Sequence, residues 1–198
     1  MTNLFATQVY QKKILFDLVD LKFEAEHIKK IDKQGQIWSA KNYKNGFTSY
    51  GSMDQLHKLS STFKNLEKKI NLHVGKYLKN LDYNASEKNL KMTNCWVNIM
   101  SKGALHTAHI HPQSVISGTY YVSIPAGASS IKFEDPRLSF FMNSPVIKEK
   151  AKLSNQRFVN LQPKAGDLVL FESWLKHEVP TNETTQSRIS VSFNYDWI

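Results

Sequence analysis

The chain has 198 residues and a mass of 22.8 kDa, enough for one domain whose hydrophobic core needs no metal or disulfide in order to fold. Its single cysteine, Cys95, excludes an internal disulfide and fits a reducing cytoplasm, and the sequence shows neither a signal peptide nor an apolar run of the roughly 20 residues of a membrane span. The formal charge of +9 comes from 26 basic residues, of which only Arg137, Arg157 and Arg188 are arginines, and this favours a solubilising surface over a nucleic-acid-binding one.

Helical patterns dominate the first half of the chain. A short opening strand is expected at residues 3–14 and a first helix at 17–32. The strongest pattern covers residues 53–81, where apolar side chains recur every three or four positions, as in a helix with one buried face. These apolar positions are Leu56, Leu59, Phe63, Leu66, Ile70, Val74, Tyr77 and Leu81. Ser52, with Gln55 three residues later, is typical of a capping box at the start of that helix.

Short β-prone runs, separated by Gly, Pro and Asn, begin at about residue 92. The predicted strands are 92–100, 106–111, 115–124, 130–135, 157–162, 167–172 and 188–197. Seven short strands favour an antiparallel sandwich or small barrel, so the predicted fold class is α+β, with the N-terminal helices packed on one side. No linker or repeat interrupts the chain, so residues 1–198 should form one domain, with a mainly helical support region at 1–91 and a β-core at 92–198.

Two segments between predicted elements are long and irregular, namely 41–52 and 137–157. Long loops inside a compact domain are often functional. We therefore expect either segment to be a candidate substrate lid.

Three of the seven histidines lie close together in "HTAHIH", at positions 106, 109 and 111. Side chains two apart on a strand point the same way and are about 6.6 Å apart, so His109 and His111 could both bind one metal ion. His106 should face the other way unless the segment curls. A third ligand must come from elsewhere, and His177, which follows the predicted strand "LVLF", is the only histidine further along the chain.

The last predicted strand carries a candidate receptor for a small carboxylate. Arg188 lies eleven residues after His177 and shares a face with Ser190, whereas Val191 and Phe193 occupy the opposite face. A guanidinium that binds a carboxylate through two parallel hydrogen bonds, with a hydroxyl beside it, suits this task.

This order of motifs, with a histidine pair, a distant histidine and then Arg-x-Ser, resembles the Fe(II)- and 2-oxoglutarate-dependent oxygenases. Their core is a double-stranded β-helix, a jelly roll or cupin-like barrel. The segment "NIMSKGALHTAHIH" is similar to the prolyl-hydroxylase spacing, which here falls on Gly103, His106 and His109. The runs "LFATQVY", "HPQSVISGTYYV", "FEDPR" and "RISVSFN" resemble a subfamily of bacterial and phage oxygenases, so the resemblance covers nearly the whole chain.

The resemblance implies a dioxygenase, in particular a hydroxylase, that consumes 2-oxoglutarate and O₂. Its Fe(II) ligands would be His109, His111 and His177, and its 2-oxoglutarate contacts would be Arg188, Ser190, Tyr121 and Asn98. His111 departs from the family pattern, because a carboxylate is expected at its position. Three neutral imidazoles also suit Zn, Ni or Cu, so the metal stays open. Glu134 or Asp135 could supply the carboxylate, although "FEDPR" more readily lines the substrate opening.

Two other functions compete with this one. A cupin-type metalloprotein that does not use 2-oxoglutarate would explain the spacing from Gly103 to His109, but the expected glutamate is replaced by Val115 or Ile116. A basic nucleic-acid-binding protein without catalysis would explain the lysine excess.

The substrate, a small molecule or a peptide, cannot be identified from the loops, and a homodimer is left open. Four large side chains, Trp96, Met100, Phe133 and Phe171, are candidates for either pocket walls or core packing.

Overall fold

The computed structural model describes residues 2, 4–84 and 89–197. The helices of this part of the chain are α1 (Leu18–Ile31), α2 (Lys33–Asn42), α3 (Leu56–Leu59) and α4 (Ser61–Asn80), with two short 3₁₀ helices at Leu138–Phe140 and Leu153–Asn155. The strands are β1 (Tyr10–Lys13), β2 (Gly46–Thr48), β3 (Leu90–Met100), β4 (His106–His109), β5 (Ile116–Ser123), β6 (Ile131–Glu134), β7 (Phe158–Leu161), β8 (Asp167–Glu172), β9 (His177–Val179) and β10 (Arg188–Trp197). None of the described helices is long and apolar enough to cross a membrane.

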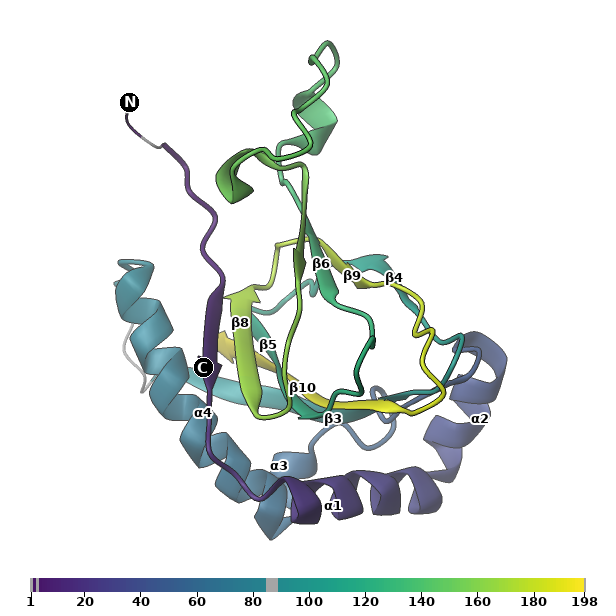
Figure 1. Cartoon of the computed structure of the whole chain (residues 1–198). Helices are drawn as coiled ribbons and strands as arrows, with labels where there is room; N and C mark the ends of the chain where they lie inside the picture. Colours follow the sequence, from purple (N-terminus) through teal and green to yellow (C-terminus); the bar gives the residue numbers. More distant parts are fainter. Residues whose placement is uncertain (1, 3, 85–88, 198) are drawn as a thin grey trace.

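Two antiparallel sheets face each other and form the double-stranded β-helix (Figure 1). The six-stranded sheet has the order β1-β8-β5-β10-β3-β2, and the four-stranded sheet has the order β4-β9-β6-β7. Strand β10 lies in the middle of the larger sheet, where it pairs with β3 on one side and β5 on the other. Strands β2 and β1 are the edge strands of the larger sheet, and β4 and β7 are those of the smaller sheet.

Helices α1 and α4 cover the outer face of the six-stranded sheet (Figure 1). The main core lies between them and the sheet, and it includes Leu21 and Ala25 of α1, Phe63 and Ile70 of α4, and Val191 of β10. The side chain of Asp17 caps α1 by accepting hydrogen bonds from two backbone N–H groups, as an N-cap carboxylate does. The first helix is thus confirmed to within a residue at each end.

The predicted helix over 53–81 is wrong in one respect, because the chain breaks at Ser60 and forms α3 and α4. Ser60 has an extended backbone, and its hydroxyl donates to Glu24 across the helix layer. Ser52 does not cap a helix, since its hydroxyl donates to the carboxylate of Asp32 at 2.6 Å and to a backbone carbonyl. Both hydroxyls therefore form tertiary hydrogen bonds, and neither caps a helix.

Each of the seven predicted strands is present, within a few residues of the expected limits. The opening strand is shorter than expected, with β1 beginning at Tyr10, and residue 3 of the predicted run lies outside the described residues. Three elements have no counterpart among the predicted ones, namely α2, β2 and β9. The two missed strands have three residues each, too few for an alternating pattern to be visible.

The two candidate lids differ in position. Segment 41–52 contains the end of α2 and all of β2, and five of its residues line the pocket described below. Segment 137–157 projects away from the barrel in Figure 1, and none of its residues, all of which the structure describes, lines that pocket. The structure thus gives no support to a lid at 137–157.

Candidate active site

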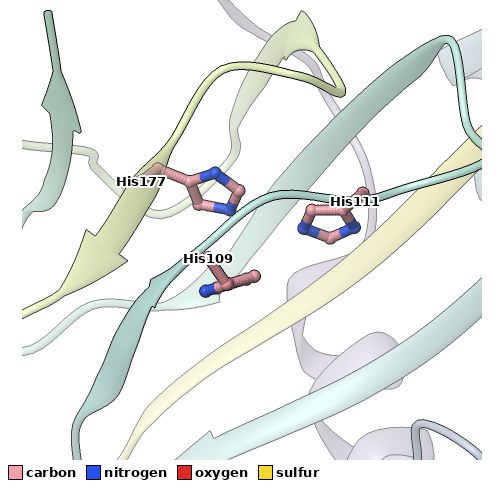
Figure 2. A group of neighbouring side chains, drawn as sticks. All are labelled: His109, His111 and His177. Atoms are coloured by element: carbon pink, nitrogen blue, oxygen red, sulfur yellow. The ribbon is translucent and has the colours of Figure 1, made fainter. Parts of the chain in front are cut away.

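Strands β4 and β9 bring three imidazoles together. His109 and His177 are direct partners in the β4–β9 register, and His111 follows two residues after β4 ends. The potential ligand atoms of these histidines lie within 4.8 Å of one another. The ring centroids are 4.4 Å apart for His109 and His177 and 5.2 Å apart for His111 and His177, and Figure 2 shows the rings around one common space. The strand pairing therefore assembles the cluster that the sequence predicted.

Hydrogen bonds leave one ring nitrogen free on each histidine of this cluster. The Nδ1 atom of His109 lies 2.7 Å from the carbonyl oxygen of Thr107, and that of His177 lies 2.9 Å from the carbonyl oxygen of Leu175. Because a carbonyl only accepts, Nδ1 carries the proton in both rings and Nε2 keeps its lone pair for a metal. The Nε2 atom of His111 is buried and has no hydrogen-bonding partner among the described residues.

Two histidines of the cluster, His111 and His177, are held in the neutral form that metals require. Burial, followed by the proximity of His109, lowers the pKa of His111 to about 4 and that of His177 to about 3. Both rings are therefore uncharged at neutral pH, and a metal ion does not have to displace a proton from them.

A buried polar network holds His111 from behind. Its backbone N–H donates to the carbonyl oxygen of Ser173 at 2.9 Å, and its ring has a side-chain hydrogen bond with Asn194, which partly opposes the fall in its pKa. Asn194 also accepts from the hydroxyl of Ser117 at 2.8 Å, and that hydroxyl lies 2.7 Å from the hydroxyl of Ser173. The group that orients His111 is thus an amide and not a carboxylate, so the surroundings add no negative charge.

A cavity of about 560 Å³ opens beside the three histidines. Arg188, Ser190, Tyr121 and Asn98 all line it, from three adjacent strands of the larger sheet. The alternation expected for the last strand is confirmed, because the residues at 188 and 190 line the cavity while Val191 packs in the core on the other face.

Arg188 is a buried cation in need of an anion. Only 2 % of it is exposed, and no carboxylate forms an ion pair with it in residues 2, 4–84 and 89–197. Its Nη1 donates to the sulfur of Met100 at 3.5 Å, its Nε has no partner among those residues, and its guanidinium lies 5.0 Å from the ring centroid of Tyr121. An uncompensated buried charge is costly, so the site is built for an anionic ligand.

Other cavity atoms also lack partners within the described chain. The hydroxyl of Tyr121 and the Oδ1 of Asn98 are both buried without a hydrogen bond, whereas the Nδ2 of Asn98 donates to Ser192 at 3.1 Å. Unsatisfied buried polar groups are rare in folded proteins, and several in one cavity mark a ligand site. A divalent metal at the imidazoles and a dicarboxylate reaching Arg188 would fit this set of residues.

Two further residues that line the cavity, Tyr43 and His106, have no role predicted from the sequence. The Tyr43 hydroxyl is buried without a partner among the described residues, and its ring stacks on His106 with centroids 4.5 Å apart. Tyr43 packs against Met100, the residue that accepts from Arg188. The β4 register is irregular after His106, so the segment curls and brings that ring to 6.1 Å from the ring of His109. Burial lowers the pKa of His106 to about 3.

The acidic candidates for a metal ligand are engaged elsewhere. Asp135 forms ion pairs with Arg137 at 3.0 Å and with Arg157 at 3.8 Å, and hydrogen bonding from Arg137 lowers its pKa. Glu134 pairs with Lys176 at 3.2 Å. Neither carboxylate belongs to the described group that could hold a metal, and neither lines the cavity.

The four large side chains divide evenly between the two expected roles. Trp96 and Phe171 line the cavity, and the ring of Phe171 lies 4.5 Å from that of His177. Met100 and Phe133 are buried in hydrophobic clusters.

Comparison with known proteins identifies the class of enzyme. The sequence pattern of the family described as "Putative 2OG-Fe(II) oxygenase" matches residues 94–194, the part of the chain that carries the three histidines and Arg188. The chain belongs to this family. It is therefore an oxidoreductase that uses Fe(II), 2-oxoglutarate and O₂, and this favours the oxygenase interpretation over the cupin-type alternative. No curated protein matches the sequence.

Solved structures share the fold. The epimerase SnoN, in complex with Fe3+, alpha ketoglutarate and nogalamycin RO, aligns with a TM-score of 0.64 at 13% identity over 96% of this chain and 79% of its own. HygX from Streptomyces hygroscopicus, with nickel and 2-oxoglutarate bound, aligns at 0.61 and 13% identity over 96% and 83%. A prolyl-4-hydroxylase from Pseudomonas putida aligns at 0.58 and 11% identity over 97% and 94%. Since the identities are low, these likenesses concern the double-stranded β-helix and not the substrate.

Proposed function

We propose that His109, His111 and His177 hold the Fe(II) ion and that Arg188 anchors the distal carboxylate of 2-oxoglutarate. The observation that carries the proposal is the juxtaposition, in one cavity, of three imidazoles within 4.8 Å of one another and a buried guanidinium without an ion pair in the described chain. One end of the cavity offers neutral nitrogen ligands and the other offers positive charge. A 2-oxo acid with a second carboxylate fits both ends, because its oxo acid binds the metal at the three histidines and its second carboxylate pairs with Arg188.

Four further residues complete the cosubstrate site in this proposal. Ser190 and the hydroxyls of Tyr121 and Tyr43 donate to the carboxylate that Arg188 binds, which would satisfy the two phenols that have no partner among the described residues. Asn98 lies two residues from Met100 on β3 and contacts the cosubstrate through its side-chain amide. In this arrangement each of the four polar side chains, which otherwise faces the cavity or lacks a hydrogen bond, contacts 2-oxoglutarate.

We propose that the reaction is hydroxylation of a small molecule. Bound Fe(II) supplies the oxygen activation, with the overall balance that a substrate C–H, O₂ and 2-oxoglutarate give C–OH, succinate and CO₂. The chain orients His109 and His177 through the carbonyls of Thr107 and Leu175, and it orients His111 through the side chain of Asn194. Behind them, Phe171 and Phe133 pack in a buried cluster that excludes water from the reacting side of the cavity.

Anaerobic calorimetry tests the proposed site. Fe(II) should bind the metal-free protein, and 2-oxoglutarate should bind tightly only afterwards, because its oxo acid needs the metal. His177→Ala should abolish both events, whereas a histidine exposed on α1, His27, serves as the control through His27→Ala. If 2-oxoglutarate neither binds the Fe(II)-loaded protein nor raises its unfolding temperature, the proposed function is wrong.

A further inference from the structure

The exposed lining residues form the mouth of the cavity, and they come from two regions of the chain. One side comes from the N-terminal region, which supplies Trp38 from α2 and Tyr50 from the loop after β2, with 52 % and 54 % of each residue exposed. The other side follows β4 and consists of the aliphatic side chains Leu105, Ile110 and Pro112. The mouth therefore combines exposed aromatic side chains with exposed aliphatic ones.

A series of rings leads inward from the mouth to the proposed metal ligands. The ring of Tyr50 lies 4.9 Å from that of Trp96, and the ring of Trp96 lies stacked at 6.0 Å from that of His111. Trp96 is only 6 % exposed, so it forms a wall of the cavity, whereas Tyr50 stands at the entrance. A flat molecule that stacks on Tyr50 would thus have its inner edge directed toward the three histidines.

The charge of the cavity is positive throughout. None of its lining residues, all within the described chain, is Asp or Glu, and its two permanent cations are Arg188 and Lys44. Lys44 is exposed and forms no ion pair within residues 2, 4–84 and 89–197. Because His111 stands where a carboxylate is usual, the loaded site also carries one more positive charge than the common triad. A cationic substrate would be repelled, and an anionic one attracted.

We infer that the substrate is a small molecule with a planar aromatic ring and an anionic substituent. The ring lies between Tyr50 and the aliphatic side of the mouth, and the anionic group pairs with Lys44. This inference rests on the proposed function, since it takes the three histidines as the reacting end. A cavity of about 560 Å³ has room for a monocyclic compound of this kind beside 2-oxoglutarate.

Three matched probes separate the two features of the inferred substrate. 3-Phenylpropionate carries both the ring and the negative charge, 3-cyclohexylpropionate carries the charge on a saturated ring, and 3-phenylpropylamine carries the ring with a positive charge. Calorimetry on the anaerobic protein loaded with Fe(II) and 2-oxoglutarate should show at least about tenfold tighter binding of 3-phenylpropionate than of the other two, about 1.4 kcal/mol, because each of them lacks one of the two interactions. Equal binding of all three, or preference for the amine, would overturn the inference.

Two substitutions assign the preference to named side chains. Tyr50→Ala should abolish the preference for the aromatic ring and keep the preference for the anion, while Lys44→Gln should do the reverse. Both side chains are exposed, so neither change threatens the core. The controls are Phe23→Ala and Lys22→Gln, which remove an exposed ring and an exposed cation from α1.

The order of measurements distinguishes this inference from the proposed function. Binding of Fe(II) and 2-oxoglutarate is established first, in the absence of any probe. If both bind and no probe does, the substrate class is wrong while the oxygenase site stands. If Tyr50→Ala and Lys44→Gln leave the preferences unchanged, the placement of the ring on Tyr50 and of the anion on Lys44 is wrong. If 2-oxoglutarate itself fails to bind, the proposed function falls and the substrate inference falls with it.

Discussion

His111 changes the charge of the site without changing its architecture. The ring occupies the position of the usual carboxylate, and its neighbours are adapted to a neutral ligand, because Asn194, Ser117 and Ser173 surround it with uncharged hydrogen-bonding groups. A carboxylate there would cancel one unit of the metal's charge, and an imidazole cancels none. The dianionic cosubstrate therefore carries more of the charge compensation than in a site with a carboxylate ligand.

Arg188 should control affinity for the cosubstrate and not for the metal. Arg188→Ala is expected to weaken 2-oxoglutarate binding at least about thirtyfold, because truncating one partner of a buried charge pair costs roughly 2 kcal/mol or more. The comparison ligand is 2-oxopentanoate, which keeps the oxo acid but lacks the distal carboxylate. Calorimetry should show that the wild type prefers 2-oxoglutarate and that the variant does not discriminate. Unchanged discrimination in Arg188→Ala would remove this residue from the cosubstrate site.

Tyr43 should contribute to the same carboxylate site from the helical half of the chain. Tyr43→Phe removes a buried hydroxyl that has no partner in the described chain, so the free energy of unfolding of the free protein should not fall. Affinity for 2-oxoglutarate should fall about tenfold, and affinity for 2-oxopentanoate should not change. The control is Tyr77→Phe, whose hydroxyl donates to the carbonyl oxygen of Gln8 at 2.7 Å and lies outside the cavity. That variant should lose about 1 kcal/mol of stability and keep its ligand affinity.

At the scale of elements, the sequence predicted the structure best where the local pattern and the tertiary environment agree. β10 is the clearest case, since its polar residues line the cavity and its apolar residues meet the helices, as their alternation requires. The prediction failed at Ser52 and Ser60, whose hydroxyls bond to Asp32 and Glu24 on distant elements. No short-range pattern contains that information.

The candidate site, like the fold, was predictable in part from the sequence. His177 could be found because it is the only histidine after the pair in a chain that needs a third ligand. Tyr43 could not, because it reaches Arg188 through Met100 across the fold, and nothing near "KNYKNG" indicates a carboxylate site. The curl that brings His106 toward His109 depends on a break in the β4–β9 register, which an even alternation does not predict.

Strand β5 should be intolerant of a side chain at Gly118. A Cβ atom there would lie 2.6 Å from the ring of Phe193 and 2.7 Å from Leu170, on the face that packs against the helices. Gly118→Ala should therefore lower the free energy of unfolding by about 1–3 kcal/mol, as measured by urea denaturation. Adding Phe193→Leu should recover part of this loss, since the ring that clashes is gone. If the two losses simply add, the Cβ atom does not meet Phe193 as inferred.

At the scale of the whole molecule, the helical half does more than cover the larger sheet. Its α1 and α4 bury the outer face of that sheet, while the segments that follow α2 and β2 supply Tyr43, Lys44 and Tyr50 to the cavity. The sheets thus provide the metal ligands and the buried arginine, and the N-terminal region provides one whole side of the mouth. Changes at the exposed residues Trp38, Lys44 and Tyr50 should therefore alter the choice of substrate without disturbing the three histidines.

The whole molecule should also be sensitive to acid before a metal is bound, because several histidines are buried in the neutral form. His57 shows the effect away from the cavity. It is 4 % exposed on α3, and burial, followed by the charge of Lys58, lowers its pKa. Above the unfolded-state pKa of about 6.5 both states are neutral and the full stability is present. As pH falls below that value the unfolded chain binds a proton that the folded chain resists, so stability declines toward the lowered pKa of the folded state.

Replacing this one histidine should flatten the pH dependence by a measurable amount. Urea denaturation of the metal-free protein at pH 7.5 and 5.5 should show a loss of stability that is smaller in His57→Leu than in the wild type, by up to about 1 kcal/mol. His27→Leu, which alters an exposed histidine on α1, should keep the wild-type loss. The comparison uses the difference between the two pH values, so any change in packing caused by the leucine cancels. An identical loss in His57→Leu and the wild type would mean that His57 takes up a proton in the folded protein as readily as in the unfolded chain.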